Sequence, residues 1–148
     1  MTEPLKKLSY KSFLGMSSIE LSKFDYFYAV RQGLDVHEDF IASFVAIFNP
    51  VIIEVNDGLF VKENFTAKQY DDLLGGGVER SEIPYWLNMI ELTDLLGEIS
   101  YDSAAELGQV IRDCWAAKLE KTFPNSGFEA RLLLEDDLDE VWVTICLR

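Results

Sequence analysis

Apolar and polar residues alternate on both sides of an acidic stretch in residues 128–148, FEARLLLEDDLDEVWVTICLR. A period of two is typical of a strand with one buried face. If residues 136–139 form the loop of a hairpin, every inward residue lies opposite another inward residue. The predicted inward pairs are Phe128–Leu147, Ala130–Ile145, Leu132–Val143 and Leu134–Val141. We therefore predict an antiparallel hairpin over residues 128–147.

A second hairpin is predicted over residues 51–63, where Asn56-Asp57-Gly58 separates two apolar runs. A three-residue loop with Gly58 in the left-handed conformation gathers the apolar side chains on one face. The pairs expected from this loop are Val55–Leu59 and Ile53–Val61. A slip by one residue would expose the apolar set, so the pattern favours the three-residue loop.

Five helices are predicted from apolar residues at helical spacing, each preceded by a residue that can cap a helix. The expected caps are Ser17, Asp35, Thr66, Ser81 and Ser103, and the expected stops are Gly33, Pro50, the Gly75–Gly77 run, Gly97 and Pro124. Residues 82–98 are apolar nearly all round, which indicates a buried helix. In the last helix, the expected inward residues are Leu107, Val110, Ile111, Cys114, Lys118 and Leu119.

These elements predict an α+β fold. The 148 residues suit one domain of ordinary size, spanning 1–148. We expect about five helices packed on an antiparallel sheet, which is made from the hairpins at 51–63 and 128–147.

The composition describes a folded acidic protein. Apolar residues make up 49% of the chain and aromatic residues 13%, more than a disordered acidic chain would carry. The net charge is −13, of which residues 1–34 carry +2 and the remainder −15. Such a surface repels phosphate backbones, which argues against nucleic-acid binding. It attracts a basic protein partner, although the charge can also serve solubility alone.

Cys114 and Cys146 are the only cysteines and form no disulfide framework or metal-ligand motif. Two buried reduced thiols are the expectation, with Cys114 in the core. The first residues resemble no signal peptide, and no apolar run is long enough to span a bilayer. We therefore predict a cytoplasmic protein that does not insert into a membrane.

The acidic stretch is the first candidate site, with carboxylates at Glu135, Asp136, Asp137, Asp139 and Glu140. It lacks the ligand spacing and the glycine of a calcium loop. The predicted register makes it a solvated turn, and the alternative is a contact with a partner.

The outward face of the same hairpin places Leu133 opposite Trp142. A sheet face open to water would not normally carry this pair. Either a helix covers it, or it is an exposed apolar patch rimmed by acids and therefore an interface.

The predicted helix 82–98 offers an alternative pocket against the sheet, with Tyr85, Glu91 and Asp94 as its polar groups. Metal-binding bundles usually add a Glu-x-x-His pair, which is missing. Asn88, on the same stripe, can instead bond nearby backbone groups. The polar stripe is then only the wet side of the helix.

No nucleophile motif, nucleotide loop or His/Cys cluster is present in the sequence. We predict a non-enzymatic protein-binding module of the inhibitor, immunity or chaperone-like kind, without cofactor or metal. The alternatives are a small-molecule-binding or enzymatic domain that uses the carboxylates of the 82–98 helix, and a homo-oligomer, such as a homodimer, whose interface covers Trp142.

Overall fold

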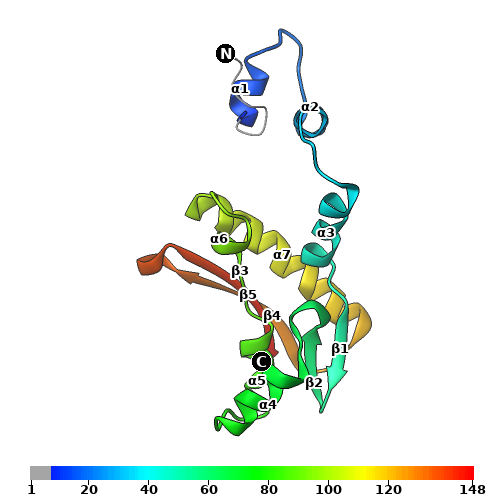
Figure 1. Cartoon of the computed structure of the whole chain (residues 1–148), viewed down its shortest axis with the longest axis vertical. Helices are drawn as coiled ribbons and strands as arrows, with labels where there is room; N and C mark the ends of the chain where they lie inside the picture. The colour runs from blue at the N-terminus through cyan, green and yellow to red at the C-terminus, as the bar shows by residue number, and fades with distance from the viewer. Residues whose placement is uncertain (1–7) are drawn as a thin grey trace. The chain divides into compact units, whose positions relative to one another are not determined.

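The computed structural model describes residues 8–148 and is a mixture of helices and two small antiparallel sheets (Figure 1). The α+β class is thus confirmed, while the number of helices and the sheet arrangement differ from the prediction. The helices are α1 (Tyr10–Leu14), α2 (Lys23–Gln32), α3 (Glu38–Phe48), α4 (Ala67–Gly75), α5 (Ile83–Leu87), α6 (Leu92–Leu95) and α7 (Tyr101–Thr122), with 3-10 turns η2 (Lys62–Asn64) and η3 (Asp136–Leu138). The strands are β1 (Ile52–Val55), β2 (Gly58–Val61), β3 (Ile90–Glu91), β4 (Phe128–Glu135) and β5 (Glu140–Leu147).

The chain divides into two compact units, one ending at Ile41 and the other spanning Ala42–Arg148. The second unit contains both sheets and both hydrophobic core clusters. The single domain over residues 1–148 stays a prediction, because two compact units can belong to one domain or to two.

The first unit contains α1 and α2, which pack through Tyr26. Its ring lies 5.5 Å from that of Tyr10 and 5.6 Å from that of Phe13. The predicted cap at Ser17 is wrong, because α2 begins six residues later with a capping box of Ser22 and Asp25.

Two other predicted helix starts need small corrections. The helix expected from Asp35 begins at Glu38, where the His37 Nδ1 atom accepts a bond from the Asp39 amide at 3.2 Å. The helix expected from Ser103 begins at Tyr101, because Ser100 is its cap.

The short helix α4 follows the prediction closely. Thr66 Oγ1 accepts from the Gln69 amide at 3.2 Å, and the helix ends in the glycine run. Gly77 adopts a φ of 91°, a conformation that favours glycine. The Val78 amide then donates back to the Leu73 carbonyl at 3.0 Å, which closes the helix end.

The predicted hairpin at 128–147 is confirmed in every pair. β4 and β5 are antiparallel, with Phe128 opposite Leu147 and Glu135 opposite Glu140. The 3-10 turn η3 and Asp139, at a φ of 53°, form the loop. We call β4, η3 and β5 the long hairpin.

The predicted register of the first hairpin is wrong. Its loop has two residues, Asn56 and Asp57, with φ of 49° and 65°, and Val55 pairs with Gly58. Consecutive left-handed residues make a type I′ turn, whose twist matches that of the strands. The apolar-face argument failed because every residue of β2 is buried, so neither face of this strand is the wet one.

The predicted long helix at 82–98 is also wrong. Residues 82–98 instead form α5, the short strand β3 and α6. Ile90 of β3 pairs with Val143, so β5 lies between β3 and β4 in a three-stranded sheet. An apolar sequence is compatible with any buried helix or strand. Here it forms a short helix, a short strand and a second short helix in the core.

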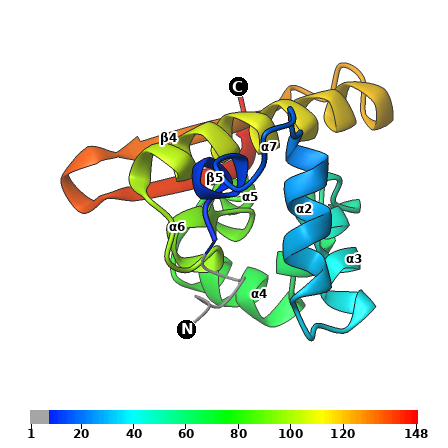
Figure 2. The ribbon, with the colours of Figure 1, turned by 90° about the horizontal axis from the view of Figure 1, so that it is seen from above.

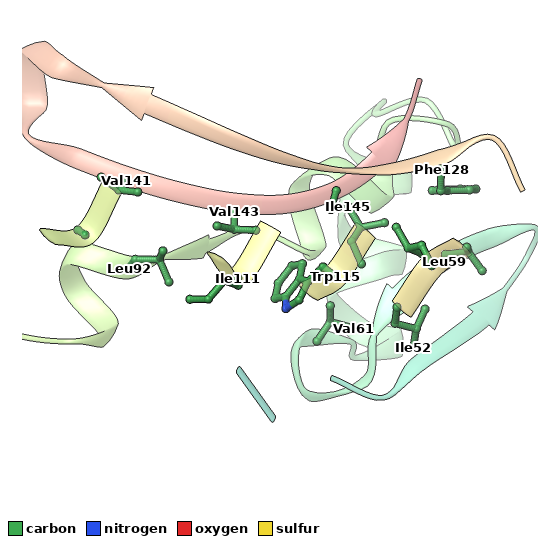
Figure 3. Close-up of a cluster of buried hydrophobic side chains, with 13 residues drawn as sticks. Ile52, Leu59, Val61, Leu92, Ile111, Trp115, Phe128, Val141, Val143 and Ile145 are labelled. Carbon is green, nitrogen blue, oxygen red and sulfur yellow. The ribbon is translucent and has the colours of Figure 1, made fainter. Parts of the chain in front are cut away.

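The main core lies between α7, the inner face of the long hairpin and the first hairpin (Figure 3). The residues that α7 buries there are Ala104, Gly108, Ile111, Trp115 and Leu119. The Trp115 indole donates to the Ile47 carbonyl at 2.7 Å, which joins α7 to the end of α3. A second cluster lies on the other side of β2 and contains Phe60, Tyr70 and Ile83.

The inward stripe of α7 is rotated from the predicted one. Ile111 and Leu119 are buried as expected, but Val110 and Cys114 are exposed, so Cys114 is not a core thiol. Gly108 explains the rotation: a Cβ there would lie 2.7 Å from Leu132 Cδ1. The helix therefore approaches the long hairpin through its smallest residue.

Asn88 joins the two sheets. Its side chain is fully buried, at 0% exposure. The Val61 amide donates to Asn88 Oδ1 at 2.8 Å, and Asn88 Nδ2 donates to the carbonyls of Leu59 at 2.9 Å and Ile145 at 3.0 Å. The prediction that Asn88 bonds nearby backbone groups is confirmed.

We expect Asn88→Ala to lower the free energy of unfolding by about 3 kcal/mol or more, because three buried backbone groups lose their partner. Urea denaturation followed by circular dichroism measures the change. Asn64→Ala is the matched control, since the amide of Asn64 makes one long bond, 3.4 Å to the Met89 carbonyl. Equal losses in the two variants would contradict this role of Asn88.

Candidate functional site

The long hairpin carries most of the candidate residues. Most of its inner side chains enter the core, while Leu134 and Leu147 stay exposed, and the alternate side chains form an outer face on the opposite side of the sheet. The outer-face residues are Glu129, Arg131, Leu133 and Glu135 on β4 and Glu140, Trp142, Thr144 and Cys146 on β5. Figures 1 and 2 both show the loop end of the hairpin projecting beyond the helices at its base.

Helix α5 covers one half of the outer face. Thr144 is fully buried, and its hydroxyl donates to the Tyr85 carbonyl at 2.7 Å. Cys146 is buried beside it, and this burial raises the pKa of its thiol, an effect that Arg131 partly offsets. The helical cover that was considered for Leu133 and Trp142 is therefore found over Thr144 and Cys146 instead.

Leu133 and Trp142 lie farther toward the loop and are half-buried. They are directly opposite each other, as predicted. The Trp142 indole donates to Glu140 Oε2 at 3.1 Å, and Glu91 of β3 pairs with Trp142 from the other side. The structure thus forms an apolar pair edged by carboxylates.

The five carboxylates of the turn, here called the acidic tip, are Glu135, Asp136, Asp137, Asp139 and Glu140. Four of them are exposed, and Glu140 is half-buried. Glu135 lies opposite Glu140, so like charges face each other across the strands. A basic group placed against the tip would relieve that repulsion.

Tyr101 fastens the acidic tip to the start of α7. Its hydroxyl donates to Asp136 Oδ1. This bond, together with the charges of Asp136, Asp139 and Asp102, raises the pKa of Tyr101 to about 12. Sequence reasoning missed this contact, because nothing near Tyr101 signals a partner 35 positions away.

The alternative pocket does not bring its three predicted residues together. Tyr85 lies in α5, Glu91 in β3 and Asp94 in α6. Tyr85 lines a cavity of about 400 Å³ that also includes Trp86, Arg131 and Cys146. Neither of the two acids is among the lining residues of this cavity. In it Arg131 is bound to Glu129, with nitrogen–oxygen distances of 2.5 and 3.1 Å.

Across residues 8–148, no three His, Cys, Asp or Glu side chains are grouped to hold a metal ion. In the same residues, no helix is both long and apolar enough to cross a bilayer.

Comparison with protein-family models, curated proteins and solved structures finds no significant match to this chain. The candidate site therefore rests on its geometry alone.

The hydrogen bond between Tyr101 and Asp136 predicts that the Tyr101 hydroxyl ionises at an unusually high pH. Because the folded pKa is raised above the ordinary value of 10, the contact stabilises the fold below pH 10 and loses that effect as the pH rises toward 12. We expect one tyrosine to ionise near pH 12 in an ultraviolet titration of the native protein. Asp136→Asn should return that step toward pH 10, whereas Asp137→Asn should leave it high. Two identical curves would contradict the contact.

Proposed function

We propose that this chain is a non-enzymatic module that binds a basic protein through the loop half of its long hairpin. The observation that carries the proposal is the half-exposed pair of Leu133 and Trp142 beside the acidic tip. Aromatic residues are enriched in the centres of protein interfaces, and charged residues in their rims.

The charge of the second unit supports a basic partner. Residues 42–148 contain 20 acidic and 8 basic residues, a net charge of −12, and the acidic tip gathers five of these carboxylates at one end of the hairpin. Such a field speeds the approach of a cationic protein and keeps acidic proteins away. Inhibitors, immunity proteins and acidic chaperones act in this way, and a cytoplasmic location suits the two unpaired cysteines.

The site favours binding over catalysis. The carboxylates expected to do chemistry, Glu91 and Asp94, lie in different elements and outside the cavity at Tyr85. At the tip, the tyrosine hydroxyl is used to hold an aspartate. A self-association that covers Trp142 is the remaining alternative, and the experiment below separates it.

The test is an affinity capture from native lysate at about 0.05 M and about 0.5 M salt, followed by titration of the purified partner. We expect a basic protein whose affinity falls about tenfold or more between the two salts. Trp142→Asp and Leu133→Ser should each weaken binding about tenfold or more, since the apolar pair is lost.

The matched control is Val110→Asp, which adds the same charge at a residue 49% exposed on α7. It should bind like the wild type. Thermal unfolding shows whether each variant is folded. An affinity that does not change with salt concentration, or an equal loss of affinity in all three variants, would contradict the proposal. A doubled mass in light scattering that Trp142→Asp restores to monomer would favour self-association instead.

A further inference from the structure

The geometry points to a specific binding mode, which rests on the proposed function: an extended basic segment of the partner adds to the sheet as a fourth strand along β4. The strand order β3–β5–β4 places β4 at the edge. It is eight residues long, the equal of β5. An edge of this length is a template for another strand.

The ladder shows which backbone groups point to that edge. The Arg148 amide donates to the Gly127 carbonyl at 3.0 Å, so this pair and every second pair after it are the hydrogen-bonded ones. The outward backbone groups therefore belong to Ala130, Leu132 and Leu134.

The edge carries few of the devices that normally prevent pairing. Proteins protect an edge strand with proline, a bulge, lysines or a short length. The register of β4 and β5 runs one to one over all eight pairs, so there is no bulge within it. The strand, FEARLLLE, contains no proline and no lysine. Its one basic residue, Arg131, is bound to Glu129 on the same strand.

A groove beside the edge offers room for side chains. It has a volume of about 510 Å³ and lies where the second half of α7 passes the beginning of β4. Ala116, Leu119 and Phe123 supply its apolar lining, and Phe128 and Ala130 form its border on β4. Its charged lining residues are Arg112, Glu120, Glu129 and Arg148, so the groove itself holds both signs of charge. A strand added to β4 would point alternate side chains toward this groove. The combination of open edge and adjoining helix groove suits an extended peptide.

Charge decides the occupant. The edge ends at Glu135 and the acidic tip, so a paired segment with Lys or Arg there neutralises facing carboxylates. A second copy of this chain is disfavoured, because two molecules of net charge −13 repel each other. The occupant is therefore a basic segment of another protein.

An antiparallel orientation fixes the sequence of this segment in outline. Its first residues lie beside Glu135, where a basic side chain shares the outer face. About five positions later it passes Ala130, whose side chain points to the inner face and the groove. We expect an apolar residue there. The ideal segment is thus basic at its amino end, alternating in the middle and apolar toward its carboxyl end.

Nuclear magnetic resonance of the full chain tests this mode with a synthetic peptide of about ten residues, enough to span β4. The peptide has two lysines, then alternating valine and threonine, then leucine. In the free protein, the amides of Ala130, Leu132 and Leu134 should exchange with deuterium faster than those of Arg131 and Leu133. Saturation with the peptide should slow the three fast amides about tenfold or more. Fast amides that stay fast at saturation overturn the proposal.

The matched variants are Leu134→Pro and Leu134→Ala. Leu134 is 49% exposed, so both changes spare the core. Proline removes an outward N–H and leaves the bonds to β5, because proline is tolerated on an edge. We expect about tenfold weaker peptide binding for Leu134→Pro, and a change of about twofold or less for Leu134→Ala. Equal affinities in the two variants contradict strand addition.

The outcomes separate this proposal from the proposed function. A partner that loses affinity with Trp142→Asp but binds Leu134→Pro normally would overturn strand addition and leave the protein-binding function intact. If no salt-dependent partner is found but the peptide protects the β4 amides, the proposed function is contradicted and strand addition at β4 is supported. A dimer in light scattering that Leu134→Pro dissociates would show that a second copy occupies the edge, which also overturns the proposal.

Discussion

The fold of the second unit depends on the three hydrogen bonds of one buried side chain, Asn88. A backbone amide of β2 and two carbonyls, one in β2 and one in β5, point to one buried position, and each needs a hydrogen-bond partner there. An amide side chain is one of the few groups that donates twice and accepts once at a single point. Because Asn88 occupies that point, α5 ends there and the chain continues as β3. The third strand of the larger sheet is therefore a consequence of how the two sheets are joined.

The two hairpins show which parts of the fold could be predicted from the sequence. The long hairpin was predicted pair by pair because its inner face is apolar along its whole length, and because the acidic residues can lie only in the turn. The first hairpin gave a misleading pattern, since Leu59 and Val61 enter one core cluster while Phe60 enters the other. Alternation identifies a face only when the other face is wet.

Those parts of the candidate site that depend only on the register of β4 and β5 could be predicted from the sequence. The opposition of Leu133 and Trp142 follows from the register alone. The cover over Thr144 does not, because it depends on the break at Asn88, which turns a supposed long helix into a short one lying against β5. The edge position of β4 was equally hidden, since strand order is set by the distant residues Ile90 and Glu91.

Gly108 has a consequence for the rate of association in the proposed complex. With no side chain between α7 and Leu132, the helix backs the strands closely, and Tyr101 fastens their far end. These two contacts hold the hairpin in place at its middle and at its loop end. In the proposed complex, the loss of conformational freedom would therefore fall mainly on the incoming segment, and association would be limited by the ordering of that segment.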